Sequence, residues 1–176
     1  MKLKYFAALM AIALVGTSMA QDKNAPDSYI WYDGGKPKRV VVDSSLVAEF
    51  GNRAETDSAP VVKNGQVRVW RKDDAAVTKA GSEKLSPVLR DGVGGRMRAL
   101  PGNIIVRLDP NWSTAQVDAW LASQGLTKVG QLPMANNLLI LSAPPGLASL
   151  ELANRLQESG TVISAQPDWW QQVERR

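Results

Sequence analysis

The feature that most constrains the fold is a regular succession of strand-like and helix-like patterns within residues 99–176. The alternation of side chains over residues 103–108 predicts a strand with Ile104 and Val106 on one face. The same reasoning along the segment predicts, in order, a strand over 103–108, a helix from Ser113 to Gly125, strands over 126–132 and 137–142, a helix from Leu147 to Gly160, and a strand over 161–165. Because these elements can close one core, residues 99–176 are expected to fold by themselves.

Both ends of the first predicted helix carry specific signals. Ser113 and Gln116 stand three residues apart at its start, which is the spacing of a capping box. Gly125 stands at its end, where a left-handed residue is favoured. Between these ends runs an apolar stripe at helical spacing that includes Trp120, which we expect to lie in the core.

The order of elements predicts an α+β protein. Right-handed crossovers arrange the segment as a four-stranded antiparallel sheet with both helices on one face, the ferredoxin-like βαββαβ arrangement. Residues 138–141 are apolar at every position, so the helix-free face of the sheet is also expected to be covered. Two coverings are open: the chain's own N-terminal hairpin, or a partner protein.

The N-terminal part of the chain predicts less regular structure. Residues 21–50 are read as a small β-rich extension, because 29–32 and 39–42 are strand-like and flank an Asp-Gly-Gly turn. Residues 46–50 are a candidate third strand. Residues 51–98 are poor in apolar side chains, and apart from one strand over 66–70 they predict an extended, partly mobile connection.

The first twenty residues resemble a secretory signal peptide. Lys2 and Lys4 precede an unbroken apolar run over 6–15, and Ser18-Met19-Ala20 supplies the small residues that a signal peptidase reads. The apolar run is too short to cross a bilayer, which needs roughly 20 residues. Residues 1–20 are therefore expected to be removed, and the protein is expected to be exported to the periplasm or the extracellular space and to leave the membrane.

The composition argues against catalysis. The sequence contains no His and no Cys, so neither a Ser-His-Asp triad nor a His- or Cys-ligated metal site can be built. The carboxylates are scattered, and no glycine-rich phosphate loop is present. We expect no enzyme activity and no cofactor. The net charge is only +4, with no block of Lys and Arg, so a nucleic-acid partner is not expected either.

Three stretches of the C-terminal half have a distinctive sequence: LPGNIIVRL over 100–108, LASLELANRLQESGTVISA over 147–165, and the exit Gln-Pro-Asp over 166–168. Together they resemble the N-terminal prodomains of subtilisin-type serine proteases. More weakly, residues 29–50 are similar to aromatic hairpins that precede this prodomain in some secreted subtilases. One departure is the turn over 133–136, which has no acidic residue where the family often has one.

The resemblance implies a function and a binding mode. Prodomains of this family lay the helix-free sheet face on paired helices of the protease and run their C-terminal tail into the substrate cleft as an added strand. They inhibit the enzyme and assist its folding. The chain is therefore expected to be an exported, propeptide-like inhibitor or folding chaperone of a separate, secreted subtilisin-like protease. Asn136 or Asn137 is expected to face the partner in place of the missing acid.

The expected protease-binding tail comprises Trp169, Trp170, Gln171, Gln172, Val173, Glu174, Arg175 and Arg176. Neighbouring side chains of an extended segment point to opposite sides, so we expect at most one of the two tryptophans to pack on its own sheet. The other would anchor the partner, the alternative being that both cap the core. By the resemblance, Val173 would fill an apolar fourth subsite, and the terminal arginines are read either as contacts or as solvated charges.

The sequence leaves two other functions and the role of one basic cluster to be considered. The same sheet could serve an exported, non-catalytic adaptor for a different protein partner. The aromatic residues Tyr29, Trp31 and Tyr32 could form a sugar-binding or enzymatic surface, although packing is the commoner role for an aromatic strand. The basic residues Arg96, Arg98 and Arg107 are expected to be solvated.

Overall fold

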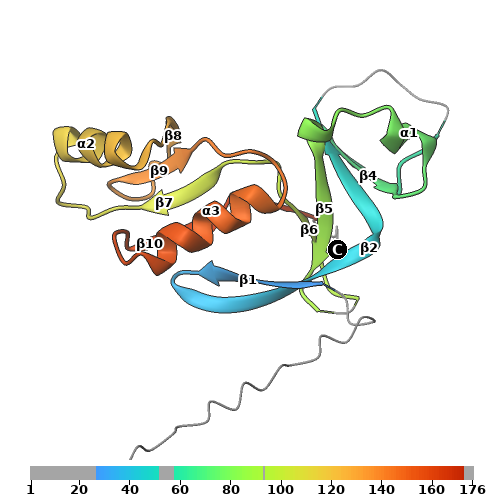
Figure 1. Cartoon of the computed structure of the whole chain (residues 1–176), viewed down its shortest axis with the longest axis horizontal. Coiled ribbons are helices and arrows are strands. Elements are labelled where there is room, and N and C mark those ends of the chain that lie inside the picture. Colours follow the sequence, from blue (N-terminus) through green and yellow to red (C-terminus); the bar gives the residue numbers. More distant parts are fainter. Residues whose placement is uncertain (1–26, 52–57, 93, 173–176) are drawn as a thin grey trace, which may run out of the picture.

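The computed structural model describes residues 27–51, 58–92 and 94–172. Within these ranges the protein is α+β, as expected, with eleven strands and three α-helices in two antiparallel sheets (Figure 1). The large sheet contains β1 (Ser28–Asp33), β2 (Lys36–Phe50), β3 (Val62–Asn64), β4 (Val67–Arg71), β5 (Leu85–Arg90), β6 (Met97–Ala99) and β11 (Trp170–Gln171). The small sheet contains β7 (Ile104–Arg107), β8 (Lys128–Gln131), β9 (Leu138–Leu141) and β10 (Ser164–Pro167).

The predicted hairpin is confirmed and is longer than expected. β1 pairs with β2 in a register that joins Asp33 to Lys36, so Gly34 and Gly35 form a two-residue turn. Both glycines have positive φ, 56° and 80°, which a tight hairpin turn of this type requires. The candidate third strand over 46–50 is the far half of β2, which continues to Phe50 past an irregularity between Asp43 and Val47.

The prediction for residues 51–98 is confirmed for its one strand over 66–70, which is β4, and the extended connection predicted for the rest is wrong. The described part of this range supplies β3, β4, β5 and β6, which extend the large sheet in the order β11-β6-β5-β2-β4-β3. Short helical turns, α1 (Ala75–Thr78) and a 3₁₀ turn (Ser82–Lys84), join β4 to β5. Pro87 made β5 hard to recognise as a strand in the sequence. The proline is tolerated there because it lies opposite Val47, where an irregularity in β2 already interrupts the hydrogen-bond ladder between the two strands. Residues 52–57 and 93 lie outside the described residues.

The small sheet has the predicted elements. Its strand order is β10-β7-β9-β8, and all its pairs are antiparallel. The first helix, α2 (Thr114–Gln124), has the predicted capping box: Ser113 Oγ accepts from Gln116 N at 3.4 Å, and Ser113 N donates to Gln116 Oε1 at 2.8 Å. Gly125 ends α2 with φ of 63°. The last strand begins three residues later than predicted, at Ser164.

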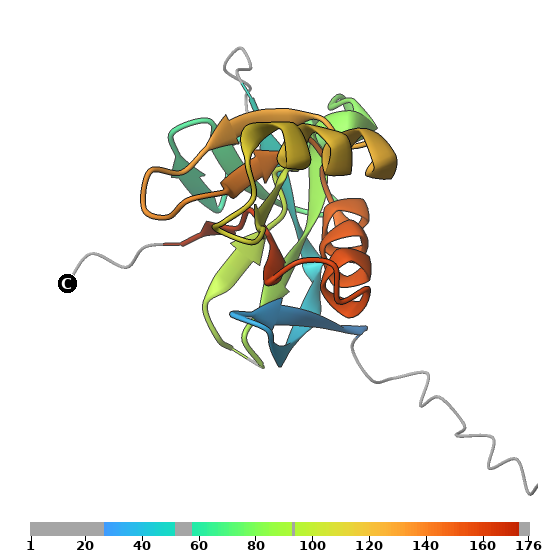
Figure 2. The ribbon, with the colours of Figure 1, turned by 90° about the vertical axis from the view of Figure 1, so that its left-hand side faces the viewer.

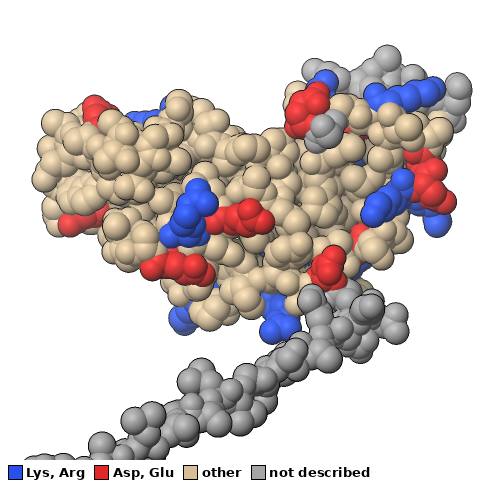
Figure 3. Space-filling view, in the orientation of Figure 1, with Lys and Arg blue, Asp and Glu red and all other residues tan. Residues whose placement is uncertain are grey.

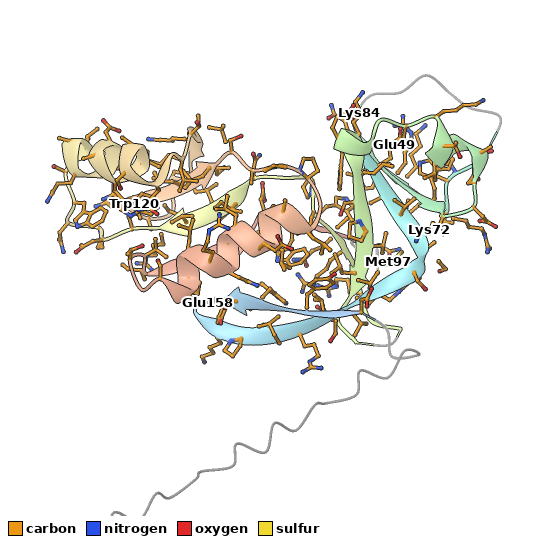
Figure 4. The ribbon with its side chains drawn as sticks, in the orientation of Figure 1. Glu49, Lys72, Lys84, Met97, Trp120 and Glu158 are labelled. Carbon is orange, nitrogen blue, oxygen red and sulfur yellow. The ribbon has the colours of Figure 1, made fainter. Side chains whose placement is uncertain are left out.

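Both long helices cover one face of the small sheet (Figure 2). The second of them, α3, spans Leu147–Glu158. The core between helices and sheet consists chiefly of Val117 and Leu121 from α2, Ala153 and Leu156 from α3, and Ile104, Val106, Leu139, Leu141 and Ala165 from the strands. Trp120 is only half-buried and packs against the margin of this core (Figure 4).

A second core joins the two sheets. Trp31, Val40, Leu89, Leu100 and Leu150 are buried together, and they come from the hairpin, from β5, from the link before β7 and from α3. Hydrogen bonds reinforce the junction: Tyr32 OH donates to Glu158 Oε1 at 3.0 Å, and Asn154 Nδ2 donates to the carbonyl of Ile30 at 2.7 Å. Residues 99–176 therefore share a core with the N-terminal half, although their ability to fold alone stays a prediction.

Candidate protein-binding surface and C-terminal segment

The helix-free face of the small sheet carries an apolar strip. Side chains alternate along β7 and β9, so Ile105, Leu138 and Ile140 lie on the opposite face from the buried residues of the core. The register places Ile105 beside Ile140 and Arg107 beside Leu138. Ile105, Leu138 and Ile140 are half-buried, and none of them belongs to the three core clusters of the described residues.

The N-terminal hairpin packs on α3, which lies on the other side of the small sheet, and its strand β1 also contacts β10, the edge strand of that sheet. Figure 4 shows Glu158 at the end of α3 next to the hairpin. Trp31 of the hairpin enters the second core. The hairpin thus reaches the small sheet at its β10 edge, and which of the two coverings applies to Ile105, Leu138 and Ile140 stays a prediction.

More apolar side chains lie exposed around the small sheet. Val129 on β8 and Met134 in the following turn are 56% and 78% exposed, and Ile163 before β10 is 50% exposed. Ile140 leans toward β8: its Cδ1 lies 3.4 Å from where a Cβ of Gly130 would be. A glycine at this edge thus leaves room for the neighbouring isoleucine.

The two asparagines of the turn have different roles. Asn136 is exposed. Asn137 is held within the chain, because its Nδ2 donates to the carbonyls of Asp109 and Trp112 at 2.7 and 3.0 Å. Its φ of 54° is a left-handed conformation that asparagine tolerates better than most residues. Asn137 therefore fastens the loop before α2 through its Nδ2, and the expectation that Asn136 or Asn137 faces a partner stays a prediction.

Both tryptophans of the expected tail pack on their own chain. Trp169 meets Trp31 edge-to-face, with ring centroids 5.3 Å apart and an interplanar angle of 74°. Trp170 packs against a third core, formed by Ala48, Val69, Val88, Met97 and Ala99 of the large sheet. The prediction that one tryptophan would be free is wrong, because the two sides of this segment face two different cores.

The next two residues are also held. In β11, Trp170 is paired with Ala99 and Gln171 with Arg98, and Gln172 N donates to Met97 O at 3.0 Å. These pairs place the C-terminal segment along the edge of β6. The remaining predicted tail residues, Val173, Glu174, Arg175 and Arg176, lie outside the described residues.

Arg98 connects these groups and is not solvated, contrary to expectation. Its side chain is buried at 9% exposure, and its guanidinium lies 5.1 Å from the ring centre of Trp31 and 5.6 Å from that of Trp169. Nε and Nη2 donate to the two carboxylate oxygens of Asp91 at 2.8 and 2.9 Å, a bidentate pair. No local sequence pattern could have revealed this group, since Trp31 and Trp169 come from opposite ends of the described chain.

The electrostatics of the segment involve one carboxyl group. Asp168, between β10 and β11, has its pKa raised by burial, and its backbone N donates to Asn103 O at 3.3 Å.

On the face shown in Figure 3, Lys and Arg are interspersed with Asp and Glu rather than gathered in one patch. Among the described residues there is no cluster of three or more potential metal ligands, and no helix there is long and apolar enough to span a membrane.

Comparisons with protein-family models, with curated proteins and with solved structures found no match to this chain. The geometry offers an apolar strip on the helix-free face of the small sheet and a C-terminal segment paired with β6 in the large sheet.

Proposed function

We propose that the protein is an exported, non-catalytic inhibitor or folding chaperone of a secreted subtilisin-like serine protease. The observation that carries the proposal is the apolar strip of Ile105, Leu138 and Ile140 on a sheet face that no described core covers. Half-buried aliphatic side chains on a helix-free sheet are typical of a surface that a partner covers.

The topology supports the comparison with prodomains. We interpret the strand order β10-β7-β9-β8, with α2 and α3 on one face, as the ferredoxin-like arrangement that the resemblance implies. A fold this common does not define a function by itself. The resemblance of residues 100–108 and 147–165 to subtilase prodomains, together with the apolar strip on the helix-free face, favours a protease partner.

The binding mode differs in one respect from the one the sequence suggested. Trp169, Trp170, Gln171 and Gln172 are held by the chain itself, so the part proposed to enter the substrate cleft is reduced to residues 173–176. In this mode Val173 would be the residue for the apolar fourth subsite. The exposed Asn136 is proposed to face the protease at the β8–β9 turn.

The proposal is tested by titrating a subtilisin-type protease with the purified protein and with an Ile105→Gln variant. A polar group on the strip would be desolvated at the interface, so we expect inhibition to weaken by about ten-fold or more. The matched control is Ile30→Gln, because Ile30 is also an isoleucine on a strand, belongs to the large sheet and is 40% exposed. Equal inhibition by both variants and by the native chain would contradict the proposed face.

A second candidate is an exported adaptor that binds another protein through the small sheet alone. The observation that favours it is the capture of both tryptophans by the chain's own cores, which leaves few tail residues for a cleft. A chain ending at Gln172 separates the two candidates. Loss of inhibition on this truncation supports the inhibitor, whereas absence of inhibition of any subtilase by the intact chain supports the adaptor.

A further inference from the structure

The second core, which joins the two sheets, contains three buried nitrogen donors without a hydrogen-bond acceptor among the described residues. These donors are Nε1 of Trp31, Nε1 of Trp169 and Nη1 of Arg98. Roughly 90% or more of the buried polar groups in folded proteins have a partner. Three unpartnered donors in one core therefore indicate that an acceptor binds there.

The three donors belong to one cluster of side chains. The ring centres of Trp31 and Trp169 are 5.3 Å apart. The guanidinium carbon of Arg98 lies 5.1 Å from the ring centre of Trp31 and 5.6 Å from that of Trp169. Hydrogen bonds of about 3 Å reach a common point from donors up to about 6 Å apart. Separations of this size allow one acceptor to serve all three donors.

We propose that this cluster is a binding site for a small monovalent anion of the size of chloride. The donors of Trp31, Trp169 and Arg98 select such a ligand, because indole and guanidinium nitrogens donate hydrogen bonds and accept none. A water molecule has two lone pairs, so a single water cannot accept from all three, and its own hydrogens would need acceptors in turn. A halide ion accepts from several donors and donates nothing.

The charges around the cluster suit a single negative charge. Arg98 pairs with Asp91 through Nε and Nη2, and Lys38, whose Nζ lies 5.6 Å from the ring centre of Trp31, pairs with Asp33. Since both cations have a carboxylate partner, the site offers directed donors and the positive edges of two indole rings rather than a large excess of charge. Such a site favours a halide over a phosphate, whose burial would leave charge uncompensated.

The anion would connect segments that are distant in the sequence. Trp31 belongs to β1, Arg98 to β6, and Trp169 lies between β10 and β11. An ion that binds only the folded protein stabilises it, and at ten times its dissociation constant it raises the folding equilibrium constant about eleven-fold. Stability is therefore expected to depend on chloride itself and not only on ionic strength. This inference does not rest on a protease partner.

The first test uses the native protein and chloride alone. Sodium chloride replaces sodium gluconate at constant ionic strength while the indole N–H signals are followed by NMR. We expect the signals of Trp31 and Trp169 to shift along a saturable curve. Trp70 is one internal control, because its Nε1 already donates to Glu49 Oε2 at 2.9 Å. Trp120 is the other, because its buried Nε1 also lacks an acceptor among the described residues but belongs to no such cluster.

The pattern of shifts decides the outcome. Saturable shifts confined to Trp31 and Trp169 would support the site. Equal shifts of all four signals would mean a general salt effect, and unshifted signals of Trp31 and Trp169 would mean that chloride does not bind there. Either of these results would overturn the proposal.

The second test removes one donor and keeps the ring. We expect Trp169→Phe to weaken chloride affinity about ten-fold, the loss of one hydrogen bond to an ion. Trp120→Phe is the matched control, because Trp120 is also a half-buried tryptophan with an unpartnered Nε1. Chloride at ten times the dissociation constant should raise Tm by about 3–6 °C in the native protein and in this control. An equal chloride response of the two variants, or a native Tm that ignores chloride, would contradict the site. If Trp169→Phe does not fold, the NMR titration of the native protein still decides.

Discussion

Replacing Trp169 by Ala tests the central structural finding, which is that the C-terminal segment belongs to the core. Full truncation of a buried tryptophan costs about 3–5 kcal/mol, and Trp169 is half-buried, so about 2 kcal/mol is expected from packing. The edge-to-face contact with Trp31 adds about 0.5–1.5 kcal/mol. The stacked Arg98 adds a contribution of about 0.5–1 kcal/mol. We therefore expect a loss of about 3–4.5 kcal/mol in the free energy of unfolding.

The assay is urea unfolding followed by circular dichroism, with thermal unfolding alongside. For a chain of this length each kcal/mol lowers Tm by about 2–4 °C, so Trp169→Ala should unfold roughly 10 °C below the native protein. Val129→Ala is the control, because Val129 is 56% exposed, and it should change stability by less than about 0.5 kcal/mol. A loss for Trp169→Ala as small as that of the control would refute the packing described for this segment.

Two further predictions concern α2 and Asp168. Ser113→Ala should lower the free energy of unfolding by about 1 kcal/mol, measured in urea, through loss of the capping box; an unchanged midpoint would contradict the cap. Burial raises the pKa of Asp168 above its ordinary value of 3.8, so the folded protein binds the proton of this carboxyl group more tightly than the unfolded protein does. The carboxyl group therefore lowers the free energy of unfolding as the pH rises from 3.8 through the pKa of the folded state. Asp168→Asn should therefore raise Tm at pH 7, with the gain disappearing below pH 3.8; a gain independent of pH would contradict this cause.

Local signals in the sequence were sufficient for the small sheet and its helices. Ser113, Gln116 and Gly125 determine the ends of α2 through contacts within a few residues, and such contacts are visible in a one-dimensional pattern. The alternation over 103–108 likewise predicted the buried face of β7. The α+β class followed from these elements, because their order restricts how a short chain can pack.

The large sheet could not be predicted in the same way, since its stability comes from distant pairings. β5 contains Pro87 and shows no clear alternation of apolar and polar residues. It is a strand because β2 pairs with it, and the paired residues Val47 and Pro87 are about forty positions apart in the sequence. Arg98 has the polarity of a surface residue, yet Trp31, Trp169 and Asp91 bury it. Asn136 or Asn137 was expected to face a partner because both lie in a turn. The hydrogen bonds that Asn137 donates to the carbonyls of Asp109 and Trp112 could not be predicted, because these carbonyls lie in the distant loop before α2.

The missed contacts change how the C-terminal segment is understood. A prodomain-like half with a free tail would bind through its sheet and its tail as separate modules. Here the tail begins from β11, which is paired with β6 and capped by Trp170 on the third core, so the tail's starting point is coupled to the packing of the N-terminal half. A substitution in that half is therefore expected to loosen β11, even though it lies far from the sheet face that carries Ile105 and Ile140.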